Sequence, residues 1–312
     1  MSHSDENYSA IKDVSHTYRN GTRALESVNL EIGVGLFGML GANGAGKSTL
    51  MRIMCTLLVP RSGTVTLGGY DVVADRTIVR TLFGYLPQEF GAWGAHSVED
   101  VLDTLASLSG LDRKTSKRRT AEVLEAVGLR EVAGRKVKKL SGGMLRRLGI
   151  AQALVHSPKV LILDEPTVGL DPEERLRFRQ MVSDLSRDRI VILSTHIVAD
   201  LGASCSNMAL IHNGRVEFQG APATIVSQAQ GRIFEIAASP EVAQQWESEE
   251  NTQIISRYYR DGKFVFRGVG RNGFKPQGAT KAENITLEEA YVAFTLDKGR
   301  PVNEIATRTG SA

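Results

Sequence analysis

The sequence predicts an α/β protein, with a mostly parallel sheet, an antiparallel flank and a helical insertion, followed by a small C-terminal α+β domain. Two observations carry this prediction. Short β-rich apolar runs alternate with helical stretches along most of the chain. The composition then shifts near residue 220, where Gly220 and Pro222 punctuate the chain, and a second pattern of strands and helices follows. We therefore expect one domain over residues 1–230 and a smaller one over residues 231–312.

The candidate strands of the first domain are short apolar runs. The clearest ones cover Gly35 to Leu40, Val160 to Leu163 and Ile190 to Ser194. The last two are almost continuously apolar, as expected for parallel strands that are buried on both faces. Each run leads within a few residues into a helical segment, which is the order found in parallel α/β units. Residues 8 to 31 alternate differently, and we interpret them as the antiparallel flank.

A helical insertion is predicted over about residues 90 to 157. The stretch from residue 97 to residue 157 has helical periodicity, few β-branched runs and many charges. Its basic side chains are typical of a solvated helix face. We therefore expect a helical subdomain between two strands of the sheet.

The C-terminal domain has its own short elements. Two of them are expected to be helices, over Pro240 to Glu250 and over residues 287–296. The expected strands are Ile233 to Ile236, Ile254 to Tyr258 and Phe264 to Phe266.

Composition excludes several classes of protein. The chain has 312 residues, of which 42% are hydrophobic and 23% charged, as in a globular protein rather than a disordered one. A net charge of +3 is too small, without clustering, to indicate a nucleic-acid binder. No run of apolar residues is long enough for a membrane-spanning helix, and the first ten residues do not resemble a signal peptide. Two cysteines cannot build a disulfide framework, which fits a reducing cytosol.

A glycine-rich loop follows the first apolar run of the sheet. Residues 41–49, GANGAGKST, fit the Walker A pattern for phosphate binding. Its glycines let backbone N–H groups wrap a phosphate, and the helix that follows adds its positive N-terminal dipole. Lys47 supplies a positive charge to the β- and γ-phosphates, and Ser48 supplies a hydroxyl to Mg²⁺. The residues that we expect at a nucleotide are Gly41, Asn43, Gly44, Gly46, Lys47, Ser48 and Thr49.

Two acidic residues end the apolar run at 160–165. Asp164 lies at the end of the candidate strand, where a carboxylate can make a second contact to Mg²⁺, directly or through water. Glu165, one residue further on, can polarise the water that attacks a phosphate. The alternative is a simple turn at Asp-Glu-Pro, and the upstream Lys47 weighs against it.

A second glycine-rich helix start lies at Leu140-Ser-Gly-Gly-Met144. Ser141 is a natural N-cap for a helix that runs to about Val155. Gly142 and Gly143 beside this helix N-terminus make a second candidate anion site. A glycine-rich cap without a ligand is the alternative.

Five motifs occur in order along the chain: GANGAGKST at 41–49, LSGGM at 140–144, VLILDEP at 160–166, GLDP at 169–172 and STH at 194–196. Together, over about residues 8–230, they resemble the nucleotide-binding subunit of an ABC transporter. The resemblance implies a P-loop NTPase core that binds ATP with Mg²⁺ and hydrolyses it. Met144 stands where many members have Gln, at a position whose side chain need not reach a phosphate, so we expect activity to survive.

The resemblance also implies roles for individual residues. Tyr18 stands where the family has an aromatic side chain that stacks on adenine. Gln88 resembles the glutamine that touches Mg²⁺ or the attacking water and senses the transport subunit. His196 resembles the switch histidine that bonds the γ-phosphate, and together with Glu165 and Gln88 it completes the implied catalytic set.

The implied ATP site is shared between two chains. Ser141, Gly142 and Gly143 resemble the signature that meets the γ-phosphate bound by the opposite subunit, and Asp171 resembles a residue of the dimer interface. We therefore expect a homodimer, or a pair with a second ATPase subunit, in the ATP-bound state. ATP binding then closes the dimer and hydrolysis opens it.

The expected function is that of an ATP-hydrolysing motor on the cytoplasmic face of the membrane, coupled to a separate integral-membrane permease. Residues 85–91, 144–147 and 287–294 resemble the branch that exports drugs, antibiotics or polysaccharides. The alternative is a soluble ABC ATPase that acts on a cytosolic assembly without a permease. A DNA-repair ATPase of the same superfamily is disfavoured, because residues 97–157 lack the sustained heptads of a coiled coil. The LSGGM motif and His196 disfavour an unrelated P-loop kinase.

Overall fold

The computed structural model describes residues 8–201, 205–239, 241, 252–260, 262–270 and 274–297. The chain divides into two compact units, residues 1–219 and 220–312. The predicted boundary lies later, at residue 230. The difference is helix α7 (Pro222–Ala229), which packs against helix α9 (Leu287–Asp297) of the second unit. In the described ranges, no helix combines the length and the apolar character that crossing a bilayer requires.

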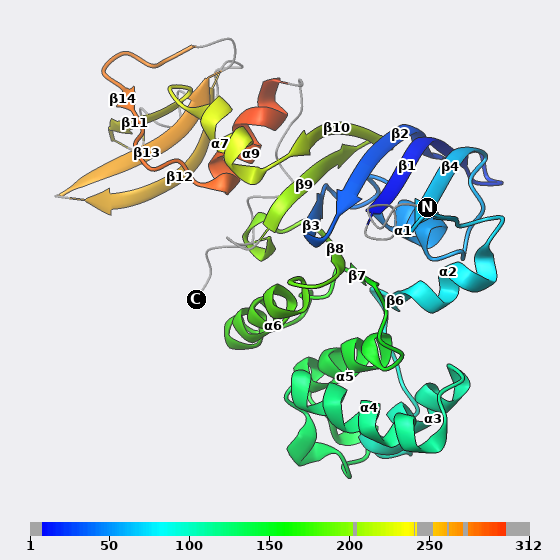
Figure 1. Cartoon of the computed structure of the whole chain (residues 1–312). Helices are drawn as coiled ribbons and strands as arrows, with labels where there is room; N and C mark the ends of the chain where they lie inside the picture. The colour runs from blue at the N-terminus through cyan, green and yellow to red at the C-terminus, as the bar shows by residue number, and fades with distance from the viewer. Residues whose placement is uncertain are drawn as a thin grey trace. The chain divides into compact units, whose positions relative to one another are not determined.

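A six-stranded sheet forms the centre of the first unit, and the predicted mostly parallel α/β fold is confirmed (Figure 1). Its strand order is β10-β9-β3-β8-β7-β6. Strand β3 pairs in parallel with β8 and β9, and β7 pairs in parallel with β6 and β8. All residues of β7 and β8 are buried, which explains their continuous apolar sequences. The strands are β3 (Gly35–Leu40), β6 (Phe83–Leu86), β7 (Val160–Asp164), β8 (Ile190–Thr195), β9 (Cys205–His212) and β10 (Arg215–Gly220).

A four-stranded sheet forms the antiparallel flank that the sequence predicts. Its order is β2-β1-β4-β5, and all its pairs are antiparallel. Buried and exposed residues alternate along most of β2, because only one face of this sheet meets the core. The strands are β1 (Tyr8–Thr17), β2 (Arg23–Gly33), β4 (Ser62–Leu67) and β5 (Tyr70–Asp71).

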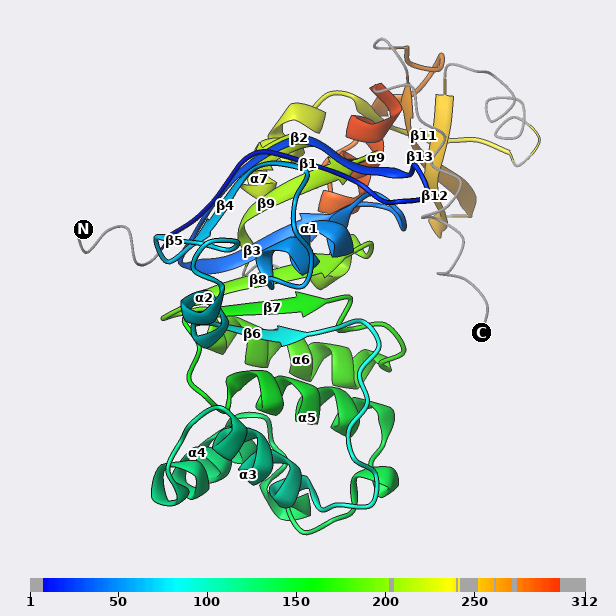
Figure 2. The same cartoon turned by 90° about the vertical axis from the view of Figure 1, so that its right-hand side faces the viewer.

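Helix α1 (Lys47–Met54) lies between the two sheets, as Figure 2 shows. Its residues Leu50, Met51, Ile53 and Met54 are fully buried in a core cluster that both sheets share. This packing holds the start of α1, and the glycine-rich loop before it, against the end of β3. Helix α2 (Arg76–Leu82) then leads into β6.

Three helices form the predicted helical insertion beside β6 (Figures 1 and 2). They are α3 (Val98–Leu108), α4 (Arg113–Ala126) and α5 (Gly142–Leu154). Side chains cap each of them: Ser97 and Asp100 form a capping box on α3, Asp112 caps α4, and Ser141 caps α5. Two short 3₁₀ turns, Arg130–Val132 and Val137–Lys139, precede α5. Helix α6 (Pro172–Leu185) follows β7 and is capped by Asp171.

The second unit contains a separate antiparallel sheet of order β12-β13-β11-β14. Its core includes Phe234, Ile236 and Phe266. The helix predicted over Pro240 to Glu250 lies outside the described residues, apart from Glu241. The strands are β11 (Ile233–Ala237), β12 (Thr252–Arg260), β13 (Lys263–Gly270) and β14 (Thr280–Lys281).

Strand β6 and helix α5 meet at a close backbone contact, and a substitution there tests how the helical insertion is joined to the sheet. A Cβ atom added to Gly84 would lie 1.9 Å from the carbonyl oxygen of Ala153, which is backbone and cannot move aside cheaply. Because such overpacking costs about 1–3 kcal/mol or more, Gly84→Ala should lower the free energy of unfolding by at least this amount. Denaturant unfolding measures it. Gly134→Ala, where an added Cβ meets nothing within 4 Å, is the matched control. Equal stability of the two variants would contradict this packing.

Candidate active site

The parallel register brings the predicted site residues to one edge of the six-stranded sheet. Leu40, at the end of β3, pairs with Thr195 at the end of β8. Asp164, at the end of β7, pairs with Ser194. The segments that leave these strands therefore begin side by side, at the carboxyl edge where open α/β sheets bind ligands. They are the glycine-rich loop at 41–46, the acidic segment that starts at Asp164, and His196.

The glycine-rich loop depends on the absence of side chains at its glycines. Gly44 and Gly46 have φ values of +78° and +109°, in the left-handed region that favours glycine. A Cβ on Gly41 would lie 2.3 Å from the carbonyl oxygen of Ile211. Asn43 and Gly44 are exposed at the turn, whereas Gly41 and Gly46 are buried. The loop thus has the tight backbone path that a phosphate cradle needs.

Lys47 is buried and points back into this loop. Its Nζ donates to the carbonyl oxygens of Gly41 and Ala42, at 2.6 and 3.1 Å. The ammonium group also lies 3.3 Å from Oε1 of Glu165 in an ion pair whose side chains are 5% and 4% exposed. Burial of two charges is tolerated here because they are paired and because two backbone oxygens accept hydrogen bonds from the ammonium group. The predicted Lys47 and Glu165 therefore meet directly.

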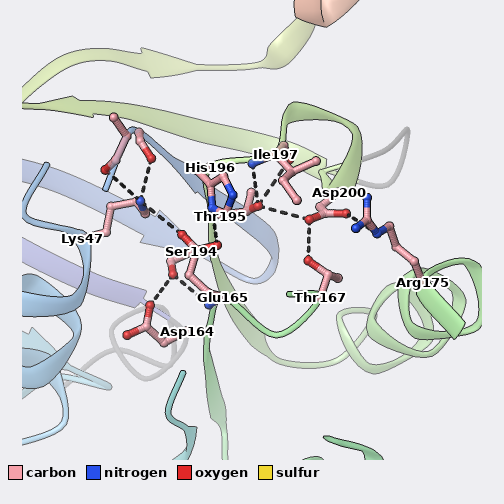
Figure 3. Close-up of polar contacts among 12 residues, drawn as sticks. Lys47, Asp164, Glu165, Thr167, Arg175, Ser194, Thr195, His196, Ile197 and Asp200 are labelled. Atoms are coloured by element: carbon pink, nitrogen blue, oxygen red, sulfur yellow. Dashed lines mark hydrogen bonds and ion pairs between the residues drawn. The ribbon is translucent and has the colours of Figure 1, made fainter. Parts of the chain in front are cut away.

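Glu165 joins Lys47 to His196 (Figure 3). Its Oε2 lies 2.8 Å from Nδ1 of His196. A carboxylate only accepts hydrogen bonds, so Nδ1 carries the proton of this contact. The imidazole is 37% exposed, so the row of three side chains runs from a buried cation to a ring that faces solvent. Within the described part of the chain, the buried Oε1 of Glu165 accepts no hydrogen bond.

Ser194 is a site residue to which the sequence analysis gave no role. Its hydroxyl donates to Oδ1 of Asp164 at 2.5 Å and accepts from the backbone N–H of Glu165 at 3.1 Å. Glu165 has a φ of +48°, which a residue with a side chain rarely adopts. The Ser194 hydroxyl therefore fixes both acidic residues. The signal available in the sequence was the serine of the STH motif, at the end of the neighbouring strand.

Tyr18 follows β1 and touches the start of α1. Its hydroxyl lies 3.0 Å from Oγ1 of Thr49, one residue beyond Ser48 in the first turn of that helix. The ring meets His16 edge to face, with centroids 5.0 Å apart. Tyr18 is half-buried rather than a core residue. The tyrosine thus lies near the N-terminal end of α1, the end at which the glycine-rich loop joins the helix.

Gln88 lies in the loop after β6 and is exposed. Helix α5 holds this loop through Arg146, whose guanidinium donates to the carbonyl oxygens of Pro87 and Gln88 at 3.2 and 2.6 Å. A groove runs between this loop, the start of α5 and the segment before α6. It is lined by residues 88–91, Gly142, Leu145, Arg146 and residues 168–170.

The signature residues lie apart from Lys47. Ser141 caps α5, accepting from the N–H of Met144 at 3.2 Å, and both Ser141 and Gly142 are exposed. Among the described residues, no hydrogen bond or ion pair joins them to the Lys47–Glu165–His196 group. Gly143 faces Glu174 of α6, whose Cδ would lie 2.8 Å from an added Cβ. The structure therefore brings Lys47, Glu165 and His196 together, whereas the signature residues lie beside the start of α6 and the groove.

Asp171 and Glu174 form the start of α6. Oδ1 of Asp171 accepts from the N–H of Glu174 at 2.8 Å, which makes Asp171 an N-cap, and its side chain is exposed. Glu174 reaches Arg147 of α5 at 3.3 Å. Arg147 also donates to the carbonyl oxygens of Val127 and Gly128. This arginine, which entered the sequence analysis only as part of the 144–147 resemblance, ties α5 to α6.

The side chains at the sheet edge can bind a hard cation such as Mg²⁺ only if a bound ligand supplies further oxygen donors. Among the described residues, no group of three His, Cys, Asp or Glu side chains could hold a metal ion by itself. Asp164 is buried, and its Oδ1 is engaged by Ser194, so Oδ2 is the oxygen that it offers. Magnesium is usually bound by one or two carboxylates together with substrate phosphates. Asp164, the hydroxyl of Ser48 and the amide of Gln88 fit that donor chemistry.

Comparison with known proteins agrees with this geometry. The family model described as ABC transporter matches residues 25–168. The chain is 34% identical to the "Uncharacterized ABC transporter ATP-binding protein YxlF" of Bacillus subtilis, over 81% of this chain and 83% of the relative. It is 36% identical to the "Linearmycin resistance ATP-binding protein LnrL" of Bacillus subtilis, over 62% and 63% of the two chains. It is 38% identical to the "Methionine import ATP-binding protein MetN" of Caulobacter vibrioides, over 68% and 66%.

Solved structures give the same picture. The chain superimposes on cbiO1 from Clostridium perfringens, described as part of the ABC transporter complex cbiONQ, with a TM-score of 0.65 and 27% identity. That match covers 78% of this chain and 95% of the other. A dimeric ATP-binding cassette in a post-hydrolysis state, bound to ADP and Pi, matches with a TM-score of 0.62 and 25% identity, over 68% and 98% of the chains.

The two cysteines give a test of the packing next to Asp164. Burial, and then the carboxylate of Asp164, raise the pKa of the Cys55 thiol well above its ordinary value, and burial raises the pKa of Cys205 to about 11. Because only the thiolate reacts, a disulfide reagent at pH 8 should modify both cysteines slowly in the native protein and rapidly after unfolding. Stability should also fall as the pH rises above about 9, where the unfolded chain loses thiol protons first. Rapid native labelling of Cys55 would contradict its placement.

Proposed function

The chain belongs to the ABC transporter family of ATP-binding proteins, and from this premise we propose that it is a motor subunit that powers export of a drug, an antibiotic or a similar compound through a separate membrane permease. Cassettes of this family bind and hydrolyse ATP, and this chain is an ATPase of that kind. The observation that carries the assignment of residues is the buried Lys47–Glu165–His196 row at the edge of the parallel sheet.

Lys47 and the glycine-rich loop bind the phosphates in this proposal. The ammonium group of Lys47 is already held at the loop by the oxygens of Gly41 and Ala42. A bound polyphosphate offers the ammonium stronger acceptors than these neutral carbonyls. The N-terminus of α1 adds backbone N–H groups and the positive end of the helix dipole. Asn43, Gly44 and Thr49 complete the cradle.

Glu165 is the proposed general base. Its Oε1 lies 3.3 Å from the Lys47 ammonium without a hydrogen bond, so it can accept one from the attacking water once the ammonium turns to the phosphates. The carboxylate then takes a proton from this water as the water oxygen bonds to the γ-phosphorus, the bond from phosphorus to the β–γ bridging oxygen breaks, and ADP leaves. His196 holds the carboxylate at Oε2 through Nδ1, which leaves Nε2 as the ring nitrogen that would meet the γ-phosphate.

Asp164, Ser48 and Gln88 are the residues that would hold Mg²⁺. When bound, the ion would neutralise negative charge on the phosphate oxygens. Asp164 is fixed for this task by the Ser194 hydroxyl. Gln88 sits on a loop that α5 carries through Arg146, so the position of its amide follows the position of the helical subdomain.

The second half of the ATP site is proposed to come from another subunit, either a second copy or a paired ATPase. The exposure of Ser141 and Gly142 at the N-terminus of α5 supports this arrangement, as does the exposed Asp171 at the start of α6. Tyr18, on the cradle side of α1, would stack on the adenine of ATP bound in the same chain. ATP would thus join two subunits, and its hydrolysis would release them.

The first test concerns Glu165. Glu165→Gln keeps the shape of the side chain but cannot take up a proton, so ATP turnover should fall about 10²- to 10⁴-fold while ATP affinity is retained. Phosphate release measures turnover, and a fluorescent ATP analogue measures affinity. Near-normal turnover would remove Glu165 from its role.

Lys47→Ala should instead weaken binding of the analogue by about tenfold or more, because the phosphates lose a charge-assisted partner. Glu122→Gln, on the exposed side of α4, is the control.

Export rests on the resemblance of residues 85–91, 144–147 and 287–294, and on the resistance protein among the relatives. The methionine import protein at similar identity supports the view that one cassette design serves both directions. A direct transport measurement is therefore the decisive one. We place the chain on the cytoplasmic face of the membrane, with residues 88–91 and the helical subdomain toward the permease.

The transport test uses cells that express the chain together with a hydrophobic protein encoded beside it. The chain should sediment with membranes only when that protein is present. Inside-out vesicles should then accumulate a fluorescent bisbenzimide drug in an ATP-dependent manner, and vesicles with Glu165→Gln should not. ATP-dependent loss of a preloaded compound would indicate import instead. A chain that never sediments with membranes would favour a cytosolic assembly as its partner.

A further inference from the structure

A second polar cluster lies next to the Lys47–Glu165–His196 row and has no part in the mechanism above. Asp200 is fully buried at the end of a 3₁₀ turn, η4 (Val198–Asp200), and its carboxylate faces three side chains (Figure 3). The hydroxyl of Thr167 donates to Oδ2 at 2.5 Å, and the hydroxyl of Thr195 lies 3.2 Å from the same oxygen. Arg175 of α6 lies 3.6 Å from Oδ1.

The members of this cluster come from the three segments that carry the proposed catalytic residues. Thr195 is the last residue of β8 and directly precedes His196. Thr167 lies two residues after Glu165, in the segment that leads to α6. Arg175 lies in the first turns of α6, one turn beyond its cap Asp171. A single buried carboxylate therefore joins the strand end that precedes His196, the segment that follows Glu165 and the first turns of α6.

We propose that Asp200 and Thr167 are positioning residues for ATP hydrolysis, which hold the Glu165 carboxylate against His196 from behind. This inference rests on the roles proposed for Glu165 and His196. The hydroxyl of Thr167 is the direct link, because it fixes the segment that follows Glu165 to the carboxylate of Asp200. Thr195 fixes that same carboxylate to the strand end that precedes His196.

The backbone of Glu165 explains why such a link is needed. Its φ of +48° is a conformation that persists only where the neighbouring structure holds it. On one side, the hydroxyl and carbonyl of Ser194 hold the N–H of Glu165, at 3.1 and 3.2 Å. On the other side, Thr167 is held by Asp200. Loss of the hydrogen bond between Thr167 and Asp200 would let the segment after Glu165 relax toward ordinary backbone angles. This relaxation would move the Glu165 carboxylate away from His196.

Complete burial makes the link strong. Thr167 and Thr195 have no exposed surface, and Asp200 is 2% exposed. Water cannot replace a lost partner in such a place, so a missing hydroxyl leaves the carboxylate short of a donor. The charge of Asp200 is balanced by Arg175 at its other oxygen. The arrangement therefore transmits the position of α6 to Glu165 through side chains that have little freedom of their own.

The test uses Thr167→Val, which removes the hydroxyl at constant volume, and Thr167→Ser, which keeps it. Thr120→Val is the matched control, because the Thr120 hydroxyl donates to Asp103 at 2.6 Å from a buried position in the helical subdomain. We expect Thr167→Val to lower kcat about ten- to a hundredfold, as misplacement of a catalytic group does, with affinity for a non-hydrolysable ATP analogue within about twofold. Thr167→Ser should restore most of the turnover, and Thr120→Val should leave it unchanged.

Two further measurements separate positioning from general stability. Thermal unfolding should show a modest loss for both Thr167→Val and Thr120→Val, because each removes one hydroxyl donor from a carboxylate: Asp200 keeps Thr195, and Asp103 is half-buried, so water can reach it. In single-turnover experiments, Thr167→Val added to Glu165→Gln should cause little further loss, since both act through the same carboxylate.

The outcomes are distinct. Normal turnover in Thr167→Val, an equal loss in Thr167→Ser or Thr120→Val, or a full additional loss in the Glu165→Gln background would each overturn the inference. Normal turnover in Glu165→Gln alone would instead overturn the role proposed for Glu165. The readouts of affinity and thermal stability keep these two failures apart.

Discussion

The ion pair between Lys47 and Glu165 is the interaction on which the arrangement of the first unit depends. Both side chains are almost completely buried, and a buried charge is strongly unfavourable unless its partner is held in place. The partners come from different strands: Lys47 follows β3 by way of the glycine-rich loop, and Glu165 follows β7. The pair can form only if β8 lies between them in parallel register, which puts Ser194 beside Asp164 and His196 beside Glu165.

The elements around the sheet edge hold these residues in place. Helix α1 is buried between the two sheets, so the first residue of the helix, Lys47, cannot move without disturbing the core beneath it. Next to the Lys47–Glu165–His196 row, the buried Asp200 is paired with the hydroxyls of Thr167 and Thr195. The site thus combines a rigid base with two more exposed parts, Gln88 and the signature at Ser141, which belong to a loop and a helix start.

The sequence predicts the features that depend on neighbouring residues, and it does not predict contacts between residues that are far apart along the chain. The glycine-rich loop, the buried strands and the cap of α5 are local patterns, and the structure has them where they are expected. Ser194, Asp200 and Arg146 make hydrogen bonds to residues that lie 29, 33 and 59 positions away in the chain, so no local pattern reveals these contacts. The place of α7 is a similar case, because its assignment to the second unit depends on packing against α9.

The close approach of Gly84 to Ala153 has a mechanical consequence. Backbone meets backbone at this point, so there is no side chain that could compress or change rotamer when the helical subdomain shifts. Sliding of α5 along β6 would drive these backbone atoms into one another, whereas rotation of the helix about this contact would not. Ser141 lies at the opposite end of α5, ~18 Å away for twelve residues of α-helix, so a rotation of ~10° about the contact would displace Ser141 by ~3 Å.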